Sequence, residues 1–329
     1  MARVGLLGVS KQYREHRALL PTDLDIADGE FLTLLGPSGC GKTTMLRIIA
    51  GFVEPSTGSV RFDGEDVTRV APNRRAIGMV FQDYALFPHL TIFENIAFGL
   101  RERGWARVKI HARVSELLDL IKLPAIARRL PAEISGGQQQ RVAFARAIAH
   151  PPRVLLMDEP LGALDLKLRE AMQFELRRLQ RALGITTVYV THDQTEAMNL
   201  SDRIAVMEAG RIRQIGLPRD IYDRPTSRFV AEFVGQINLL PTQTRGHAGS
   251  LAIRPQHLAI ANGAGIPEGH DSLPARVLTQ VFTGNLVHIQ LQAQDTLLTV
   301  ETRPSEHDVA EGEAVTLHWH PDRCIVLGA

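Results

Sequence analysis

The sequence has little of what membrane-spanning, disulfide-stabilised or nucleic-acid-binding proteins use. Its 329 residues include 2 cysteines, Cys40 and Cys324, too few for a disulfide framework, which favours a reducing cytoplasm. The formal net charge is +1 with no long run of one sign, which argues against binding to nucleic acid. No apolar stretch approaches the roughly 18–20 residues that cross a bilayer, and the N-terminus has no signal-peptide pattern. We therefore expect a globular cytoplasmic protein.

Hydrophobic residues make up 44 % of the chain, enough for substantial cores in two domains. Strand-like and helix-like segments alternate as far as about residue 235, which predicts a mainly parallel sheet covered on both faces. The strand-like runs are 4–9, 19–26, 31–35, 59–62, 77–81, 154–157, 186–190, 204–207 and 211–215. Helical spacing of apolar residues predicts a helical region at about 85–150 and a further helix over 165–183.

Beyond residue 235 the helical pattern disappears, and short apolar runs alternate with turn residues. These runs are 251–253, 275–281, 286–291, 297–300, 314–319 and 324–327. They predict a separate small β-domain, a partial barrel of five or six strands. We therefore place a domain boundary between residues 235 and 236.

A glycine-rich loop between a predicted strand and a predicted helix is the most specific motif. The run 31–35 predicts a buried strand, and 45–50 predicts a helix ended by Gly51. The loop between them consists of Gly36, Pro37, Ser38, Gly39, Cys40, Gly41, Lys42, Thr43 and Thr44, which fits G-x-x-x-x-G-K-[ST]. Backbone N–H groups can surround phosphates there, Lys42 can reach the β- and γ-phosphates, and the Thr43 hydroxyl can bind Mg²⁺. The loop predicts ATP binding.

Two further motifs follow along the chain. Asp158 and Glu159 end the apolar run 155–157, where the first carboxylate can complete a Mg²⁺ shell and the second can orient or deprotonate water. Upstream, Ser135, Gly136, Gly137 and Gln138 open a predicted helix, and such a start is another anion site. Taken alone, these residues would be an ordinary strand end and an ordinary helix cap. Their order after the phosphate loop favours the functional interpretation.

With these three motifs, residues 1 to about 235 resemble the ATP-binding cassette (ABC) ATPases. The resemblance implies that Ser135–Gln138 is the signature motif, with Ile134 in place of the commoner leucine. It implies that Tyr13 stacks on adenine, and that Gln82 senses Mg²⁺ and the membrane partner. Asp165 would cross a dimer interface, and His192 would contact the γ-phosphate.

Alone, Tyr13 would be a shielded aromatic at a strand end, Gln82 an edge polar residue and His192 a core histidine. The ordered spacing of the whole set favours the functional roles.

Residues 236–329 resemble the small TOBE-like regulatory domain that follows the cassette in importer-type ABC ATPases. The resemblance rests on 233–240 and 253–258, although Gln256 stands where the family more often has Glu. His318 and His320 alternate along one strand near Cys324, which could suggest a metal site. An incidental surface pair is favoured, because no two-cysteine cluster or carboxylate set accompanies them.

The resemblance implies an ATP-hydrolysing importer subunit that works with Mg²⁺ on the cytoplasmic face of the inner membrane as a peripheral protein. Two copies would pair head to tail, each ATP lying between one phosphate loop and the other copy's signature. Catalysis would fall to Glu159, His192, Lys42 and Gln82, and the metal shell to Thr43, Gln82 and Asp158. Two membrane permease subunits would dock near Gln82 and the region 90–150. A periplasmic or extracellular solute-binding protein would deliver the cargo.

The stretches 161–169, 179–186 and 201–204 resemble the spermidine/putrescine import ATPases. Importers of ferric iron, 2-aminoethylphosphonate, sulfate or sugars have similar cassettes, so these solutes stay open. A different class, soluble ABC proteins acting on nucleic acid or ribosomes, usually carries two cassettes or a long coiled coil, which this chain lacks. A metabolic kinase would not explain the motif at 135–138.

Overall fold

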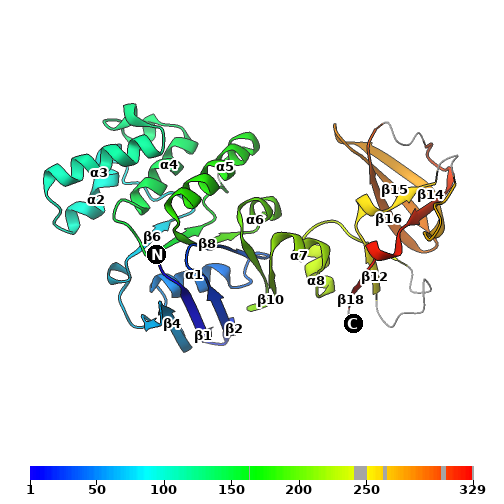
Figure 1. Ribbon diagram of the computed structural model, residues 1–329, viewed down its shortest axis with the longest axis horizontal. Coiled ribbons are helices and arrows are strands. Elements are labelled where there is room, and N and C mark those ends of the chain that lie inside the picture. The colour runs from blue at the N-terminus through cyan, green and yellow to red at the C-terminus, as the bar shows by residue number, and fades with distance from the viewer. Residues whose placement is uncertain (163, 241–249, 262–264, 305–308, 328–329) are drawn as a thin grey trace. The chain divides into compact units, whose positions relative to one another are not determined.

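The structure is a computed structural model that describes residues 1–162, 164–240, 250–261, 265–304 and 309–327. Contacts divide the chain into two compact units, Met1–Pro218 and Arg219–Ala329. Figure 1 shows the elements of both, and each unit is described by itself. The domain boundary predicted between residues 235 and 236 stays a prediction.

The larger sheet of unit 1 has six strands, of which five run parallel and one, at an edge, is antiparallel. Their order is β10 (Arg211–Gly216), β9 (Arg203–Glu208), β3 (Phe31–Leu35), β8 (Thr186–Thr191), β7 (Val154–Asp158) and β6 (Ile77–Val80). Strand β9 is parallel to β3, and β10 is antiparallel to β9. Every residue of β3, β7 and β8 is buried, as expected for a parallel sheet covered on both faces.

The two faces of this sheet pack into different cores, because successive side chains of a strand point to opposite sides. On one face Phe31, Met157 and Tyr189 join a cluster formed with the helical region. On the other face Leu32 and Val188 join a cluster that contains helix α1 (Lys42–Ala50) and a second sheet. That second sheet is antiparallel, in the order β2 (His16–Ile26), β1 (Val4–Tyr13), β4 (Thr57–Phe62) and β5 (Glu65–Asp66).

The helices of unit 1 that follow α1 have recognisable caps at some of their ends. They are α2 (Ile92–Glu102), α3 (Arg107–Leu120), α4 (Gly136–Ala147), α5 (Leu166–Leu183) and α6 (Gln194–Leu200). Thr91 and Glu94 form a capping box at the start of α2, and Gly184 ends α5 at φ +63°. Figure 1 shows α2 and α3 beside α4 and α5, and α2 contacts both α3 and α4. Short 3₁₀ turns lie at Pro72–Arg74, Pro124–Ile126 and Pro131–Glu133.

Unit 2 is a small β-domain preceded by two short helices, α7 (Pro218–Asp223) and α8 (Arg228–Phe233). One sheet is β11 (Asn238–Leu239), β12 (Ser250–Ile253) and β18 (Ile325–Leu327). The other is β13 (Ala259–Ile260), β17 (Ala314–Trp319), β14 (Asp271–Phe282), β15 (Val287–Ala293) and β16 (Thr296–Thr302). Short 3₁₀ turns lie at Pro255–His257 and Pro321–Arg323. The buried Trp319 belongs to the core of this unit.

A buried arginine ties α7 and α8 to the β-domain. The guanidinium of Arg254 donates to the carbonyls of Tyr222, Ala231 and Gly235 at 2.9–3.0 Å. These bonds explain why the contacts group α7 and α8 with unit 2.

The predicted α/β fold class is confirmed: a mainly parallel sheet with an antiparallel subdomain and a helical region, followed by an all-β domain. The sequence patterns did not predict α6, α7 and α8. These helices have 7, 6 and 6 residues, too few turns for apolar periodicity to appear.

A second buried arginine holds the end of α1 and generates a test of the fold. Arg75 is 3 % exposed and donates to the carbonyls of Ile48 and Ile49, each at 2.8 Å, and to those of Thr68 and Val70. Arg75→Met should destabilise unit 1 by about 3 kcal/mol, because buried carbonyls lose their donors. The measurement is the urea midpoint of the chain. The exposed neighbour Arg74→Met is the control, and an equal loss in both variants would contradict this account.

Candidate functional site

The predicted site residues follow the carboxyl ends of the parallel strands. The register aligns these ends at one edge of the sheet, pairing Leu35 with Thr191, Val190 with Asp158, and Met157 with Val80. The phosphate loop follows β3, Glu159 follows β7 and His192 follows β8. Gln82 lies exposed, two residues beyond the end of β6. This edge is where ligands bind in open parallel sheets.

The phosphate loop runs so close to neighbouring backbone that two of its glycines admit no side chain. A Cβ at Gly36 would lie 2.4 Å from the Met207 carbonyl oxygen, and one at Gly41 would lie 2.5 Å from that of Ala18. Gly41 also has φ +107°, which side chains rarely adopt. Helix α1 begins directly after it, at Lys42, so its first N–H groups belong to the loop.

The side chains of Lys42 and Cys40, both in the loop, are buried. Lys42 is 5 % exposed, and its Nζ donates to the carbonyls of Gly36 at 2.7 Å and Pro37 at 3.0 Å. Burial raises the pKa of the Cys40 thiol, so that thiol stays protonated at neutral pH. Lys42 therefore holds its positively charged ammonium group beside the loop carbonyls of Gly36 and Pro37.

Oxygen atoms suited to a hard cation lie beside the loop. The Thr43 hydroxyl donates to Asp158 Oδ1 at 3.2 Å. Burial raises the pKa of Asp158, with the negative charge of Glu159 adding to the effect, so a nearby cation would favour its ionised form. A hydroxyl and a carboxylate at this spacing fit Mg²⁺, which prefers oxygen ligands and keeps several waters.

Glu159 and His192 face one another. His192 Nδ1 lies 3.1 Å from Glu159 Oε2. Glu159 has φ +44°, a strained value for a non-glycine residue, and its N–H donates to the Val190 carbonyl at 3.0 Å. Strain of this kind concentrates at functional sites, and here it turns the carboxylate off the end of β7 toward the histidine.

The signature motif lies at the start of α4 and does not join this cluster. Ser135 is the N-cap, and its N–H donates to Gln138 Oε1 at 3.0 Å. A Cβ at Gly137 would lie 3.0 Å from Leu168, so the motif packs on the first turn of α5. Asp165 caps that same helix by accepting from the Leu168 N–H. Among the residues described, no hydrogen bond joins 135–138 to the phosphate loop.

Tyr13 also does not join this cluster; it is the last residue of β1, in the antiparallel sheet. Its ring is 45 % exposed, and Lys11 Nζ lies 5.0 Å from the ring centre. An exposed ring with a cation on one side keeps a surface available for stacking.

Comparison with known proteins decides the family. The ABC transporter family matches residues 19–162, and the TOBE domain family matches 251–327. The spermidine/putrescine import ATP-binding protein PotA of Thermobifida fusca is 45 % identical, over 98 % of this chain and 93 % of that protein. The chain belongs to the ABC transporter ATPases. The prediction of an ABC-type ATPase with a TOBE-like domain is confirmed.

Other relatives of this ABC ATPase agree. PotA of Pseudomonas fluorescens is 46 % identical over 98 % of this chain and 97 % of that protein. A solved dimeric structure of a bacterial ABC transporter cassette is 36 % identical with a TM-score of 0.59, covering 66 % of this chain and 99 % of that one. A cassette in a post-hydrolysis state with ADP and Pi is 35 % identical with a TM-score of 0.58, covering 66 % of this chain and 99 % of that one. None of the helices described in this ABC ATPase combines the length and the apolar character that a membrane span requires.

The ABC ATPase has a polar network around His192 that sequence reasoning missed. The Glu196 carboxylate accepts hydrogen bonds from the hydroxyls of Tyr189 at 2.8 Å and Thr191 at 2.7 Å, and all three side chains are buried. Next to it, Asp193 pairs with Arg169 at 3.3 Å. The available signal was the placement of these charged residues beside His192 and just after Asp165.

The histidines considered for a metal site lie in unit 2 of the ABC ATPase. His318 Nδ1 lies 3.0 Å from Nδ1 of His270, and the ring of His270 also faces His320. Within the described residues, no group of three metal-ligating side chains has the geometry to hold an ion.

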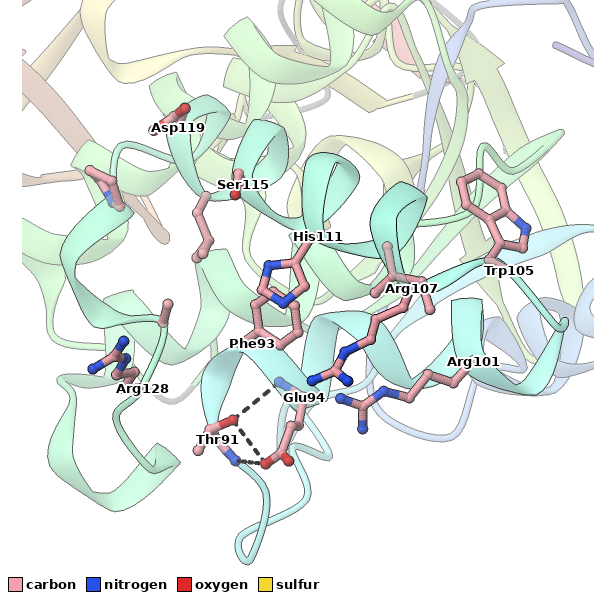
Figure 2. Close-up of a pocket in the computed structure, with 14 residues that line it drawn as sticks. Thr91, Phe93, Glu94, Arg101, Trp105, Arg107, His111, Ser115, Asp119 and Arg128 are labelled. Atoms are coloured by element: carbon pink, nitrogen blue, oxygen red, sulfur yellow. Dashed lines mark hydrogen bonds between the residues drawn. The ribbon is translucent and has the colours of Figure 1, made fainter.

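A cavity of about 970 Å³ lies in the helical region of the ABC ATPase, between α2, α3 and the segment that follows. Figure 2 shows His111 beside Phe93 inside it, with ring centres 4.6 Å apart. Arg101 and Arg107 point toward Glu94, whose carboxylate accepts hydrogen bonds from Thr91. The floor is therefore aromatic and the rim mainly basic.

The buried Glu196 predicts a pH-dependent stability. Burial raises the pKa of Glu196 above its value in the unfolded chain, so folding with the ionised form is unfavourable at neutral pH. Glu196→Gln keeps an oxygen acceptor for Tyr189 and Thr191 and should raise the melting temperature at pH 7.5. The gain should shrink as pH falls through the raised pKa, because Glu196 then becomes protonated.

The measurement is thermal unfolding of both proteins between pH 5 and 8. The exposed Glu170→Gln on α5 is the matched control. A gain for Glu196→Gln that does not change with pH would contradict the role assigned to burial.

Proposed function

We propose that this ABC ATPase is the ATP-hydrolysing subunit of a solute importer, with polyamines as the cargo. The observation that carries the proposal is the match to spermidine/putrescine import ATP-binding proteins over 98 % of this chain and 93–97 % of theirs, cassette and β-domain together. Ferric iron, 2-aminoethylphosphonate, sulfate and sugars are the alternative solutes. The subunit would act on the cytoplasmic face of the inner membrane as a peripheral protein.

In this proposal the ATP site is completed by a second copy of the chain. Gly36–Thr44 would surround the phosphates, and Tyr13 would stack on adenine. The signature at Ser135–Gln138 is an anion-binding helix start with no hydrogen bond to its own phosphate loop in the described residues, which supports its use by the partner copy. A two-fold dimer would present it there, with Asp165 at the interface. The dimeric form of a related cassette supports this arrangement.

Hydrolysis would be divided among residues already placed at the sheet edge. Thr43, Asp158 and Gln82 would hold Mg²⁺, which would supply neutralisation of the negative charge on the phosphates. Glu159 would hold and deprotonate the attacking water, and the 3.1 Å contact lets His192 orient that carboxylate. His192 would also contact the γ-phosphate. Lys42 would exchange its loop carbonyls for phosphate oxygens. Gln82, exposed beyond β6, would respond to both metal and permease.

The two membrane permease subunits would dock on the helical region near Gln82. The cavity beside Phe93 and His111 offers an aromatic floor, and Arg101 and Arg107 make its rim basic. Such a site suits an amphipathic helix that carries an apolar and an acidic side chain. Closing and opening of the ATPase dimer would then switch the permease pair between inward- and outward-facing states. The solute-binding protein would supply cargo from the other side of the membrane.

Glu159→Gln tests the catalytic assignment. The variant should bind ATP and keep the dimer closed, while turnover falls by at least about 100-fold, because the water loses its base. Size-exclusion chromatography with light scattering, with and without ATP, measures the dimer, and phosphate release measures turnover. Near-normal hydrolysis by the variant would contradict the assignment.

Purification of the native complex through this subunit tests the transport proposal. Two permease subunits should accompany it from membranes, and the associated binding protein should retain spermidine or putrescine, measured by mass spectrometry. His111→Asp should lose the permeases, because a carboxylate replaces the aromatic contact and repels an acidic docking helix.

Val108→Asp on the same helix is the matched control, since Val108 is 81 % exposed and does not line the cavity. Its complex should stay intact. A binding protein that retains iron or a phosphonate and no polyamine would refute the polyamine proposal alone. Recovery of ribosomes or nucleic acid without permeases would refute the importer proposal.

A further inference from the structure

One side chain joins the segment that caps α5 to the segment that carries His192. Arg169 Nη2 donates to the Leu164 carbonyl at 3.0 Å, and Nη1 donates to Asp193 Oδ2 at 3.3 Å. The backbone N–H of Arg169 also donates to the Asp165 carbonyl at 2.8 Å. Leu164 and Asp165 precede α5, whereas Asp193 directly follows His192. Arg169 therefore bonds to both segments at once.

Asp193 is itself fixed from several directions. Its Oδ1 accepts from the Glu196 N–H at 3.0 Å as the cap of α6, and its N–H donates to the Thr191 hydroxyl at 3.0 Å. One carboxylate oxygen of Asp193, Oδ1, thus bonds to the first turn of α6, and the other, Oδ2, bonds to Arg169 on α5. A displacement of Arg169 would pull on a residue adjacent in the chain to His192, whose ring lies 3.1 Å from Glu159.

The surroundings of Arg169 restrict the positions that its guanidinium group can take. The side chains of Arg169 and Asp193 are 26 % and 27 % exposed, so the pair is partly shielded from water. Arg169 Nε is buried with no hydrogen-bond partner in the described structure. An unpaired buried donor costs free energy, and its presence in a native structure calls for an explanation. A planar guanidinium can hold a carbonyl and a carboxylate in one fixed geometry, which lysine cannot.

We propose that Arg169 is a positioning residue that transmits movement of the Leu164–Asp165 segment to His192. The inference rests on the proposed function, because it takes Asp165 to lie at the dimer interface. When the second copy closes on that interface, Arg169 carries the shift to Asp193, and His192 and Glu159 reach their working geometry. In each subunit, contact with the partner copy thereby brings His192 and Glu159 of that same subunit into the geometry that hydrolysis needs.

A double-mutant cycle on hydrolysis tests this link. Arg169→Gln removes the charge and the fork, while Asp193→Ser keeps a helix-capping oxygen for α6 and is too short to reach Arg169. Each single variant should lower kcat about tenfold and leave the KM for ATP within about twofold. The double variant should also be only about tenfold slower, because both changes break one connection. A hundredfold loss in the double variant would overturn the proposal.

Arg169→Lys separates positioning from simple stabilisation. Lysine keeps the charge and one bond, so the melting temperature should return close to that of the unaltered protein while kcat stays about tenfold low. Recovery of kcat in step with the melting temperature would overturn the proposal. If Arg169→Gln does not fold, Arg169→Lys and Asp193→Ser carry the test.

Arg178→Gln is the matched control, an exposed arginine on the same helix that pairs with Glu175 and should leave kcat unchanged. Absence of any ATP hydrolysis by the unaltered chain would refute the proposed function. Hydrolysis with full additivity in the cycle would refute only the role of Arg169.

Discussion

Burial of β3, β7 and β8 on both faces is the constraint on which the rest of the structure depends. Because every residue of these strands is buried, a slip in register would expose apolar side chains and break paired backbone groups. The register is therefore fixed, and with it the edge where the strands end. The phosphate loop, Glu159 and His192 lie together because each is the first polar segment after a buried strand. The chemistry is positioned by the core beneath it.

That dependence explains how much the sequence could predict. A strand, a glycine-rich loop and a helix in succession leave few alternatives, so the sequence alone predicts that Lys42 and Thr43 follow the loop at the start of a helix. The all-β character of the domain beyond residue 235 followed from short apolar runs separated by turns. The apolar stripe of α5 was visible over its 18 residues, together with Gly184 as its stop.

The rest depends on contacts between residues far apart in the chain. The pairing of Arg169 with Asp193 spans 24 positions and has no periodicity, so the placement of the two residues near Asp165 and His192 does not reveal that they pair. Arg254 likewise looks like any arginine until its bonds to the carbonyls around α7 and α8 are seen. The partner of His318 was missed because His270 lies directly before β14, 48 positions away in the chain. Local sequence patterns predict where helices and strands lie along the chain, whereas pairs of distant side chains become visible only in the packed structure.

The hydrogen bonds that Lys42 makes within its own loop have one more consequence. Its ammonium bonds to two carbonyls of its own loop, which makes those carbonyls internal competitors for any phosphate oxygen. A small inorganic anion offers little beyond what the lysine already has, whereas a triphosphate adds backbone N–H contacts along the whole loop. If the loop binds ATP as proposed, the same bonds would re-form when product leaves and would favour its departure. This one side chain would then give the loop both selectivity for long polyphosphates and a means of release.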